Sequence, residues 1–248
     1  MTVRIGTSGW SYDHWDGVLY PTGLPVAGRL ARYVQEFDTV ELNASFYRWP
    51  RDATFEGWSR RLPDGFTMTV KAHRGLTHFR RLRDPEAWVE RFERCWRALG
   101  ERREAILVQL HPAIDRTDDA VGLLNRFLAD MSDWIPVAVE FRHPSWDAAD
   151  VYDLLERHGA AYVVTSGHGL PLVPRATSRL VYVRMHGPDD RLYAGSYTDD
   201  ALRWWADRIG EWQDEGRDVL VYFNNDGEGH AVRNARTLKG LLAGVPPA

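Results

Sequence analysis

Eight short runs rich in Val, Ile and Leu recur along the 248-residue chain, and the stretches between them carry apolar residues at helical spacing. The runs centre on Ile5, Glu41, Thr69, Val108, Val139, Val163, Val183 and Val221. Nearly every stretch between two runs is long enough for the crossover helix that parallel strands require. The alternation therefore predicts an α/β fold, and we expect one (β/α)8 TIM-like barrel that forms a single domain over residues 1–248.

Helix signals between the runs support this repeat. Asp84 and Pro85 open a segment that Gly100 ends, and Thr198 opens another that ends near Gly216. Apolar stripes mark these two helices and three more: Trp88, Phe92, Trp96 and Leu99; Leu202, Trp205, Ile209 and Trp212; Val121, Leu124, Phe127, Leu128 and Met131; Val151, Leu154 and Leu155; Ala235, Leu238 and Leu242. Residues 167–174, between the sixth and seventh runs, contain two Pro and two Gly, so we expect the helix there to be irregular or missing.

The charge balance and the cysteine content exclude several classes of protein. Lys and Arg total 31 and Asp and Glu total 35, so the net charge of −4 gives no general attraction to nucleic acid or membranes. Any anion binding is therefore expected to be local. Cys95 is the only cysteine, which excludes an internal disulfide and a thiolate-rich zinc site. Because the sequence has neither an apolar signal core nor a membrane-length apolar run, we expect a cytoplasmic protein.

Polar residues of one parity collect toward the ends of six of the eight runs, where alternate side chains of a barrel strand point inward. They are Glu41, Asn43, Ser45, Lys71, His73, Gln109, Glu140, Arg142, Arg184, His186, Asn224 and Asp226. Charged groups are expensive to bury without partners, and barrel enzymes keep their chemistry at the C-terminal mouth, so the pattern predicts a site there. The alternative is a buried ion-pair network, such as Lys71 with Glu41, that catalyses nothing.

The loops expected around this mouth add further polar groups. Thr7-Ser8-Gly9-Trp10 forms a small-residue turn whose backbone N–H groups can approach an anion. The loop from Arg74 to Arg83 holds four arginines, His78 and no acidic residue, so it is either a lip that steers anions or a solvated loop with scattered ion pairs. His143-Pro144-Ser145-Trp146 follows the fifth run, and Asn225 and Asp226 follow the eighth.

Motifs found in order along nearly the whole chain resemble the DUF72 family, also called the YecE-like family. They are Gly6-Thr7-Ser8-Gly9-Trp10, Val40-Glu41-Leu42-Asn43 with Ser45-Phe46-Tyr47, Val70-Lys71-Ala72, Thr77-His78, Gln109-Leu110, Glu140-Phe141-Arg142-His143 with Ser145-Trp146, Arg184-Met185-His186-Gly187, and Tyr222-Phe223-Asn224-Asn225-Asp226 with Asn234-Ala235. The resemblance implies a TIM-barrel-like fold and no established activity, because the family is named for a domain of unknown function. His73 and His111 stand where the resemblance leads us to expect other residues, so we set both aside as site members.

Together these residues favour an acid–base or hydrolytic enzyme that acts on a polar, anionic substrate carrying phosphate or carboxylate. The catalytic candidates are the carboxylates Glu41 and Glu140, the cations Lys71 and Arg184, and the proton carrier His186. The candidates for substrate binding are Ser8, Trp10, Asn43, Tyr47, His78, Arg142, His143, Trp146, Asn224, Asn225 and Asp226.

Two alternatives from other classes stay open. One is a metal-dependent phosphodiesterase of the endonuclease type that binds nucleic acid through the Arg74 to Arg83 loop. Its divalent metal would lie among Glu41, Glu140, His186 and Asp226, although the cations predicted for the same pocket would repel it. The other is a non-catalytic module that only binds a metabolite.

A glycosidase is disfavoured, because the fourth and seventh runs end in Gln109 and Arg184, where such barrels usually carry their carboxylates. Apart from the open question of a divalent metal, the sequence indicates no cofactor. It also indicates no membrane partner, and it does not fix the oligomeric state.

Overall fold

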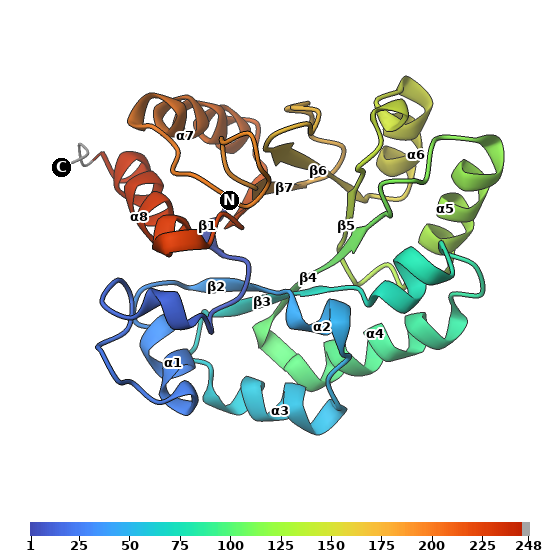
Figure 1. The fold of residues 1–248 in the computed structure, drawn as a ribbon. Helices are drawn as coiled ribbons and strands as arrows, with labels where there is room; N and C mark the ends of the chain where they lie inside the picture. Colours follow the sequence, from blue (N-terminus) through green and yellow to red (C-terminus); the bar gives the residue numbers. More distant parts are fainter. Residues whose placement is uncertain (245–248) are drawn as a thin grey trace. The chain divides into compact units, whose positions relative to one another are not determined.

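The computed structural model describes residues 1–244, and within them eight parallel strands form a sheet (Figure 1). The strands are β1 (Val3–Thr7), β2 (Thr39–Leu42), β3 (Thr67–Lys71), β4 (Arg103–Gln109), β5 (Val137–Glu140), β6 (Ala161–Ser166), β7 (Leu180–Met185) and β8 (Asp218–Phe223). Their order is β1-β8-β7-β6-β5-β4-β3-β2, so strands that follow one another in sequence are neighbours. The α/β, TIM-like fold expected from the sequence is confirmed, and each predicted run centre lies in a strand.

Helices follow most of the strands, as expected from the apolar stripes. They are α1 (Val26–Tyr33), α2 (Ala44–Tyr47), α3 (Asp52–Arg61), α4 (Glu86–Leu99), α5 (Asp118–Asp130), α6 (Ala149–Arg157), α7 (Asp199–Asp214) and α8 (His230–Leu242), with a π-helix at Gly75–Phe79 and 3-10 turns at Asp13–Trp15, Gly100–Arg102, Pro144–Trp146 and Gly227–Gly229. No helix lies between β6 and β7, which confirms the expectation for that stretch. The Thr198 side chain accepts a hydrogen bond from the Ala201 N–H, so the predicted cap of α7 is also confirmed.

The start of α4 differs from the sequence expectation. Pro85 is the N-cap of α4, and no side chain caps the helix. Asp84 has a φ of 46°, in the left-handed region that non-glycine residues rarely adopt, and its carboxylate lies 3.6 Å from Arg80 Nη1. The Asp84 carboxylate therefore interacts with Arg80 within the loop and does not cap the helix.

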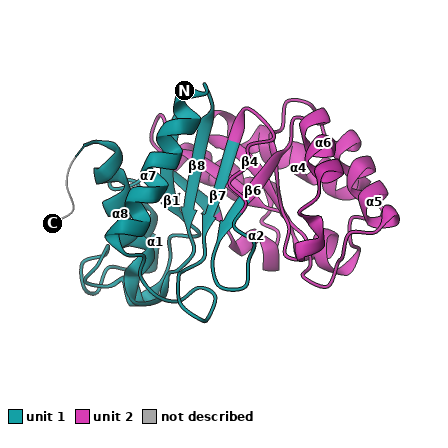
Figure 2. Ribbon diagram, turned by 90° about the horizontal axis from the view of Figure 1, so that it is seen from above, with its two compact units in different colours: residues 1–41, 164–172, 181–248 teal, residues 42–163, 173–180 magenta. Residues whose placement is uncertain are grey.

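The described chain divides into two compact units, coloured teal and magenta in Figure 2. Unit 1 comprises residues 1–41, 164–172 and 181–244, and unit 2 comprises residues 42–163 and 173–180. The single domain expected over residues 1–248 stays a prediction, and its last four residues lie outside the described part.

In unit 1, β1 lies between two partners. It pairs in parallel with β8, with Thr7 opposite Phe223, and Ser8 forms an isolated parallel bridge with Glu41 at the end of β1. Gly6 allows the close approach to β2, because a Cβ atom there would lie 2.3 Å from the Thr39 carbonyl oxygen. The turn after β1 is thus held against the strand that carries Glu41.

In unit 2, the register of β3, β4 and β5 fixes which side chains share a face. Lys71 pairs with Leu107, and Gln109 pairs with Glu140. Because side chains alternate along a strand, Lys71, Gln109 and Glu140 lie on one face at the carboxyl ends of three adjacent strands. The polar parity seen in the sequence is therefore a shared face within this unit.

No helix within residues 1–244 has both the length and the apolar character needed to cross a membrane.

Replacing Tyr33 with Phe tests the contact between α1 and the end of β1. The fully buried Tyr33 hydroxyl accepts a hydrogen bond from Thr7 N–H at 3.0 Å and donates one to the Thr39 carbonyl at 3.0 Å. Removing it leaves a buried N–H without this acceptor, so we expect the free energy of unfolding to fall by about 1–3 kcal/mol. Urea unfolding measures this, with the exposed Tyr47→Phe as the control; equal stability of both variants would contradict the assignment.

Candidate functional site

The carboxylate of Glu41 is a fully buried polar group of unit 1. Arg184 Nε donates to Glu41 Oε2 at 2.9 Å, and Arg184 Nη2 donates to Oε1 at 2.7 Å. The Tyr182 hydroxyl donates to Oε2 at 2.6 Å, and the Ser8 hydroxyl donates to Oε1 at 2.6 Å. All four residues are buried, so the carboxylate is held by four donors away from water. Within unit 1, the cation that pairs with Glu41 is therefore Arg184.

This arrangement fixes protonation states as well as positions. Burial, with the negative charge of Glu41, raises the pKa of Tyr182 well above its usual value. Tyr182 therefore stays a neutral donor. Two hydrogen bonds from the planar Arg184 guanidinium fix the orientation of the Glu41 carboxylate. The catalytic roles expected for Glu41 and Arg184 stay predictions.

A second carboxyl group of unit 1, that of Asp226, lies after β8. Burial raises the pKa of Asp226, so this carboxyl keeps its proton to a higher pH than usual. His14 Nε2 lies 3.6 Å from Asp226 Oδ2 and 2.6 Å from its carbonyl oxygen, which also accepts a hydrogen bond from Trp15 Nε1 at 3.2 Å. Tyr12 stacks obliquely on Trp15 and donates its hydroxyl to the Ser8 carbonyl at 2.5 Å.

Three other candidates of unit 1 interact through amides. Asn224 Nδ2 lies 3.2 Å from Nδ1 of the buried His186. Asn225 Nδ2 donates to the carbonyl of Gly195 and to Asn234 Oδ1, both at 2.9 Å, which ties the end of β8 to helix α8. Asn225 Oδ1 is buried without a hydrogen-bond partner.

In unit 2, a charged group lies at the carboxyl ends of β3, β4 and β5. The buried Glu140 forms an ion pair with Arg142, and Lys71 Nζ lies 4.4 Å from the centre of the Phe46 ring. Gln109 is 91 % buried, since 9 % of its surface is exposed, and its Oε1 has no hydrogen-bond partner. A buried amide oxygen without a hydrogen-bond donor is costly, so Gln109 Oε1 is suited to accept a hydrogen bond from a ligand or a water molecule.

His78 lies beside these charged side chains, and its pKa is shifted. Its ring lies 4.8 Å from the Phe46 ring and 5.0 Å from the ring of His111. Burial, followed by the positive charges of His111, Lys71, Arg142 and Arg74, lowers the pKa of His78 from its usual value near 6.5 to about 4. Nδ1 of His78 lies 2.9 Å from the Thr77 hydroxyl, which leaves Nε2 as the nitrogen available to a ligand.

The arginines of the loop from Arg74 to Arg83 take different partners. Arg80 and Arg83 form exposed ion pairs with Asp84 and Asp119, at 3.6 and 2.7 Å. Arg74 lies over the rings of Tyr47 and Phe79, at 5.7 and 5.5 Å from their centres. Arg80 and Arg83 thus form the scattered ion pairs expected of a solvated loop. Arg74 instead lies over two aromatic rings.

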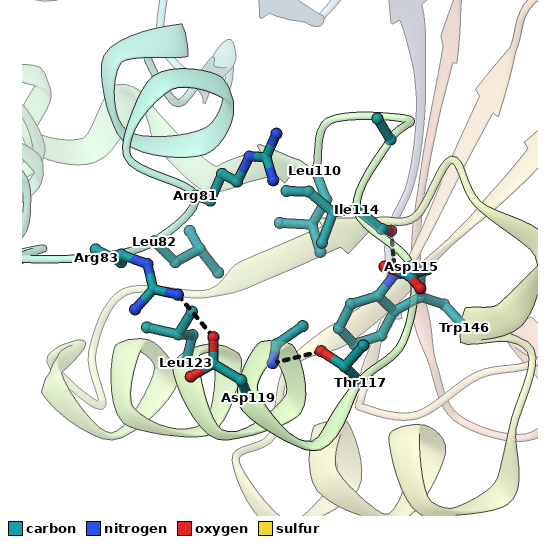
Figure 3. Close-up of a pocket in the computed structure, with 12 residues that line it drawn as sticks. Arg81, Leu82, Arg83, Leu110, Ile114, Asp115, Thr117, Asp119, Leu123 and Trp146 are labelled. Atoms are coloured by element: carbon teal, nitrogen blue, oxygen red, sulfur yellow. Dashed lines mark hydrogen bonds and ion pairs between the residues drawn. The ribbon is translucent and has the colours of Figure 1, made fainter.

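Beside this loop, a pocket of about 110 Å³ opens within unit 2 (Figure 3). Arg81 and Arg83 lie on one side of it, and Asp115 and Trp146 lie on another. Trp146 is buried against Phe141, with ring centres 4.8 Å apart, and its Nε1 donates to the Ile114 carbonyl at 2.8 Å. The buried indole therefore forms a wall of the pocket.

The remaining sequence candidates have local roles. The His143 side chain accepts a hydrogen bond from Ser145 N–H and caps the turn at Pro144–Trp146. Asn43 precedes helix α2, and its Oδ1 is buried without a hydrogen-bond partner. The carbonyl of Trp10 accepts a hydrogen bond from Tyr20.

Within each unit the structure brings several candidates together: Ser8, Glu41 and Arg184 in unit 1, and Lys71, His78, Glu140 and Arg142 in unit 2. The prediction that both sets face one hollow joins the two units and stays a prediction. Sequence reasoning set aside His111, which lies beside His78, and missed His14 and Phe46. The signal for Phe46 was its place in the motif Ser45-Phe46-Tyr47, and no sequence pattern singled out His14. Among residues 1–244, no three His, Cys, Asp or Glu side chains are grouped so that they could hold a metal ion.

Comparison with known proteins places these features in a family. The chain is 30% identical to UPF0759 protein YunF of Bacillus subtilis (strain 168), over 97% of this chain and 94% of that protein. It is 31% identical to a DUF72 family protein of Thermotoga maritima MSB8, whose crystal structure matches with a TM-score of 0.89 over 98% of this chain and 100% of the other. SacUVDE, at 9% identity and a TM-score of 0.59 over 97% of this chain and 98% of the other, shares the fold alone. The model of the family described as "Protein of unknown function DUF72" matches residues 4–247, and the chain belongs to that family.

Proposed function

We propose that this protein is an acid–base enzyme that acts on a polar substrate carrying phosphate or carboxylate, bound at the carboxyl ends of β3, β4 and β5. The observation that carries the proposal is the position of His78, where burial, followed by the charges of His111, Lys71, Arg142 and Arg74, lowers its pKa to about 4. Glu140 forms an ion pair with Arg142 in this group, and an anionic substrate would further offset its positive charge.

An anion among these groups would change the state of His78. Its negative charge offsets the field of Lys71 and Arg142, so the pKa of His78 rises toward the range in which a histidine exchanges protons at neutral pH. The substrate then activates its own proton carrier. Glu140 lies on the same strand face as Lys71, where its carboxylate can accept a proton or hold a substrate hydroxyl.

Two other functions predict different results. A non-catalytic module would bind the same anion and turn over nothing. A metal-dependent phosphodiesterase would need a ligand group for its metal, and such a group is not found preformed in the described residues.

The first test is the titration of His78 by NMR, without and with inorganic phosphate. We expect a pKa of about 4 without phosphate and a higher value when phosphate balances the surrounding positive charges. Lys71→Gln removes one of those charges, so it should raise the pKa of His78 without phosphate and weaken the response to phosphate.

The control is His158 at the end of α6, whose Nε2 lies 2.8 Å from Asn125 Oδ1 and whose NMR signals should not respond specifically to phosphate. An equal response of both histidines to phosphate would indicate a general effect of ionic strength. A pKa of His78 that phosphate does not change would count against the anion site.

The second test is Glu140→Gln in a screen of phosphoesters and carboxylate-bearing substrates. Loss of an acid–base group typically lowers kcat about 10²- to 10⁴-fold, so we expect a loss in that range. Thermal unfolding checks that the variant is folded, and Glu86→Gln, at an exposed carboxylate in the first turn of α4, is the matched control. Turnover at the level of the unchanged protein would remove Glu140 from the chemistry.

A further inference from the structure

Two large aromatic side chains of unit 2 lie open to solvent beside an arginine. Tyr47, at the end of α2, is 65% exposed, and Phe79, at the end of the π-helix Gly75–Phe79, is 72% exposed. The guanidinium of Arg74 lies over both rings, 5.7 Å from the centre of Tyr47 and 5.5 Å from that of Phe79. Exposed rings held by a cation in this way form a preordered stacking surface.

This surface continues into the group of positive charges around His78. The ring of Phe46 lies 5.0 Å from the ring of Tyr47 and 4.8 Å from that of His78, while Lys71 Nζ lies 4.4 Å above it. A ligand that stacks on Tyr47 would therefore have the positive charge of Lys71 nearby, over the adjacent ring of Phe46. The two features suit a molecule that carries flat aromatic groups and negative charges side by side.

Nucleic acid has this combination. Sugars stack on aromatic rings without bringing charge, and acidic peptides bring charge without flat faces, whereas each nucleotide brings a phosphate and a planar base. In a duplex the faces of the bases are covered by their neighbours, so only an unpaired strand can offer them to Tyr47 and Phe79. The rings lie on the open surface, which leaves room for a strand to continue beyond one nucleotide.

We propose that Tyr47, Arg74 and Phe79 stack the bases of a single-stranded nucleic acid, with a backbone phosphate at Lys71 and His78. The proposal rests on the anion site proposed above and names its substrate class. Arg80 and Arg83 add a reserve of positive charge, because their exposed ion pairs with Asp84 and Asp119 are weak enough to exchange for phosphates. Binding should therefore weaken as the salt concentration rises.

The experiment measures fluorescence anisotropy of a labelled oligothymidylate of about 12 residues, a length that spans the site size of many single-strand binders. Tyr47→Ala and Phe79→Ala should each weaken its binding about tenfold, the usual loss when a stacked base is released. An abasic strand of the same length should bind more weakly than the thymidylate and should respond little to either substitution. Arg74→Lys keeps the charge and removes the planar group, so its loss should lie between those of the unchanged protein and Tyr47→Ala.

The matched control is Trp134→Ala. Trp134 precedes β5, is 45% exposed and has the Arg97 guanidinium 5.7 Å from its ring centre, so it reproduces the exposed arginine–aromatic contact away from the carboxyl ends of the strands. This substitution should leave the affinity unchanged. An equal loss in Trp134→Ala would overturn the assignment to Tyr47, Arg74 and Phe79.

Other outcomes would also overturn the proposal. Equal binding of the abasic strand would mean a surface that recognises charge alone, and equal binding of a duplex would exclude base stacking. Thymidine monophosphate that competes as well as the strand would indicate a mononucleotide site. If phosphate raises the pKa of His78 but the oligothymidylate does not bind, only this inference fails. If phosphate leaves His78 unmoved, the proposed function fails first.

Discussion

The four donors around Glu41 are the interaction on which the order of unit 1 depends. They come from the turn after β1 and from β7, while the carboxylate comes from β2, so one buried carboxylate connects the three segments. A slip of one residue in any of these strands would turn its side chains to the other face and leave a buried charge without its partner. The arrangement therefore selects one register, whatever part Glu41 takes in chemistry.

In unit 2, several positively charged side chains surround His78, whereas in unit 1 four donors surround one carboxylate. Burial, followed by the nearby positive charges, lowers the pKa of His78 to about 4, and Gln109 Oε1 has no hydrogen-bond partner on the face that Lys71 and Glu140 share. Where unit 1 has satisfied its buried carboxylate fully, unit 2 holds groups whose energy a bound anion would lower. This contrast is the basis on which we propose the ligand site in unit 2.

The sequence predicted the strands and the polar parity well, because both follow from periodicity within a few residues of each position. The pairs of side chains that contact each other across the fold were harder to predict. That Glu41 meets Arg184 depends on which strands adjoin and on how two long side chains turn, and the ion pair of Arg83 with Asp119 joins a loop to the start of α5. The left-handed backbone at Asp84 and the place of His111 beside His78 are likewise set by tertiary packing, which local pattern does not encode.

The interleaved path of the chain has a consequence for dissecting this protein. Three of the four boundaries between the two units fall inside β2, β6 and β7, and the fourth lies between β6 and β7, so no continuous gene fragment encodes either unit whole. Truncation inside any of these three strands would sever a hydrogen-bonded strand and expose its edge, which invites aggregation. Isolating one unit would require circular permutation or a designed splice across residues 163 and 173.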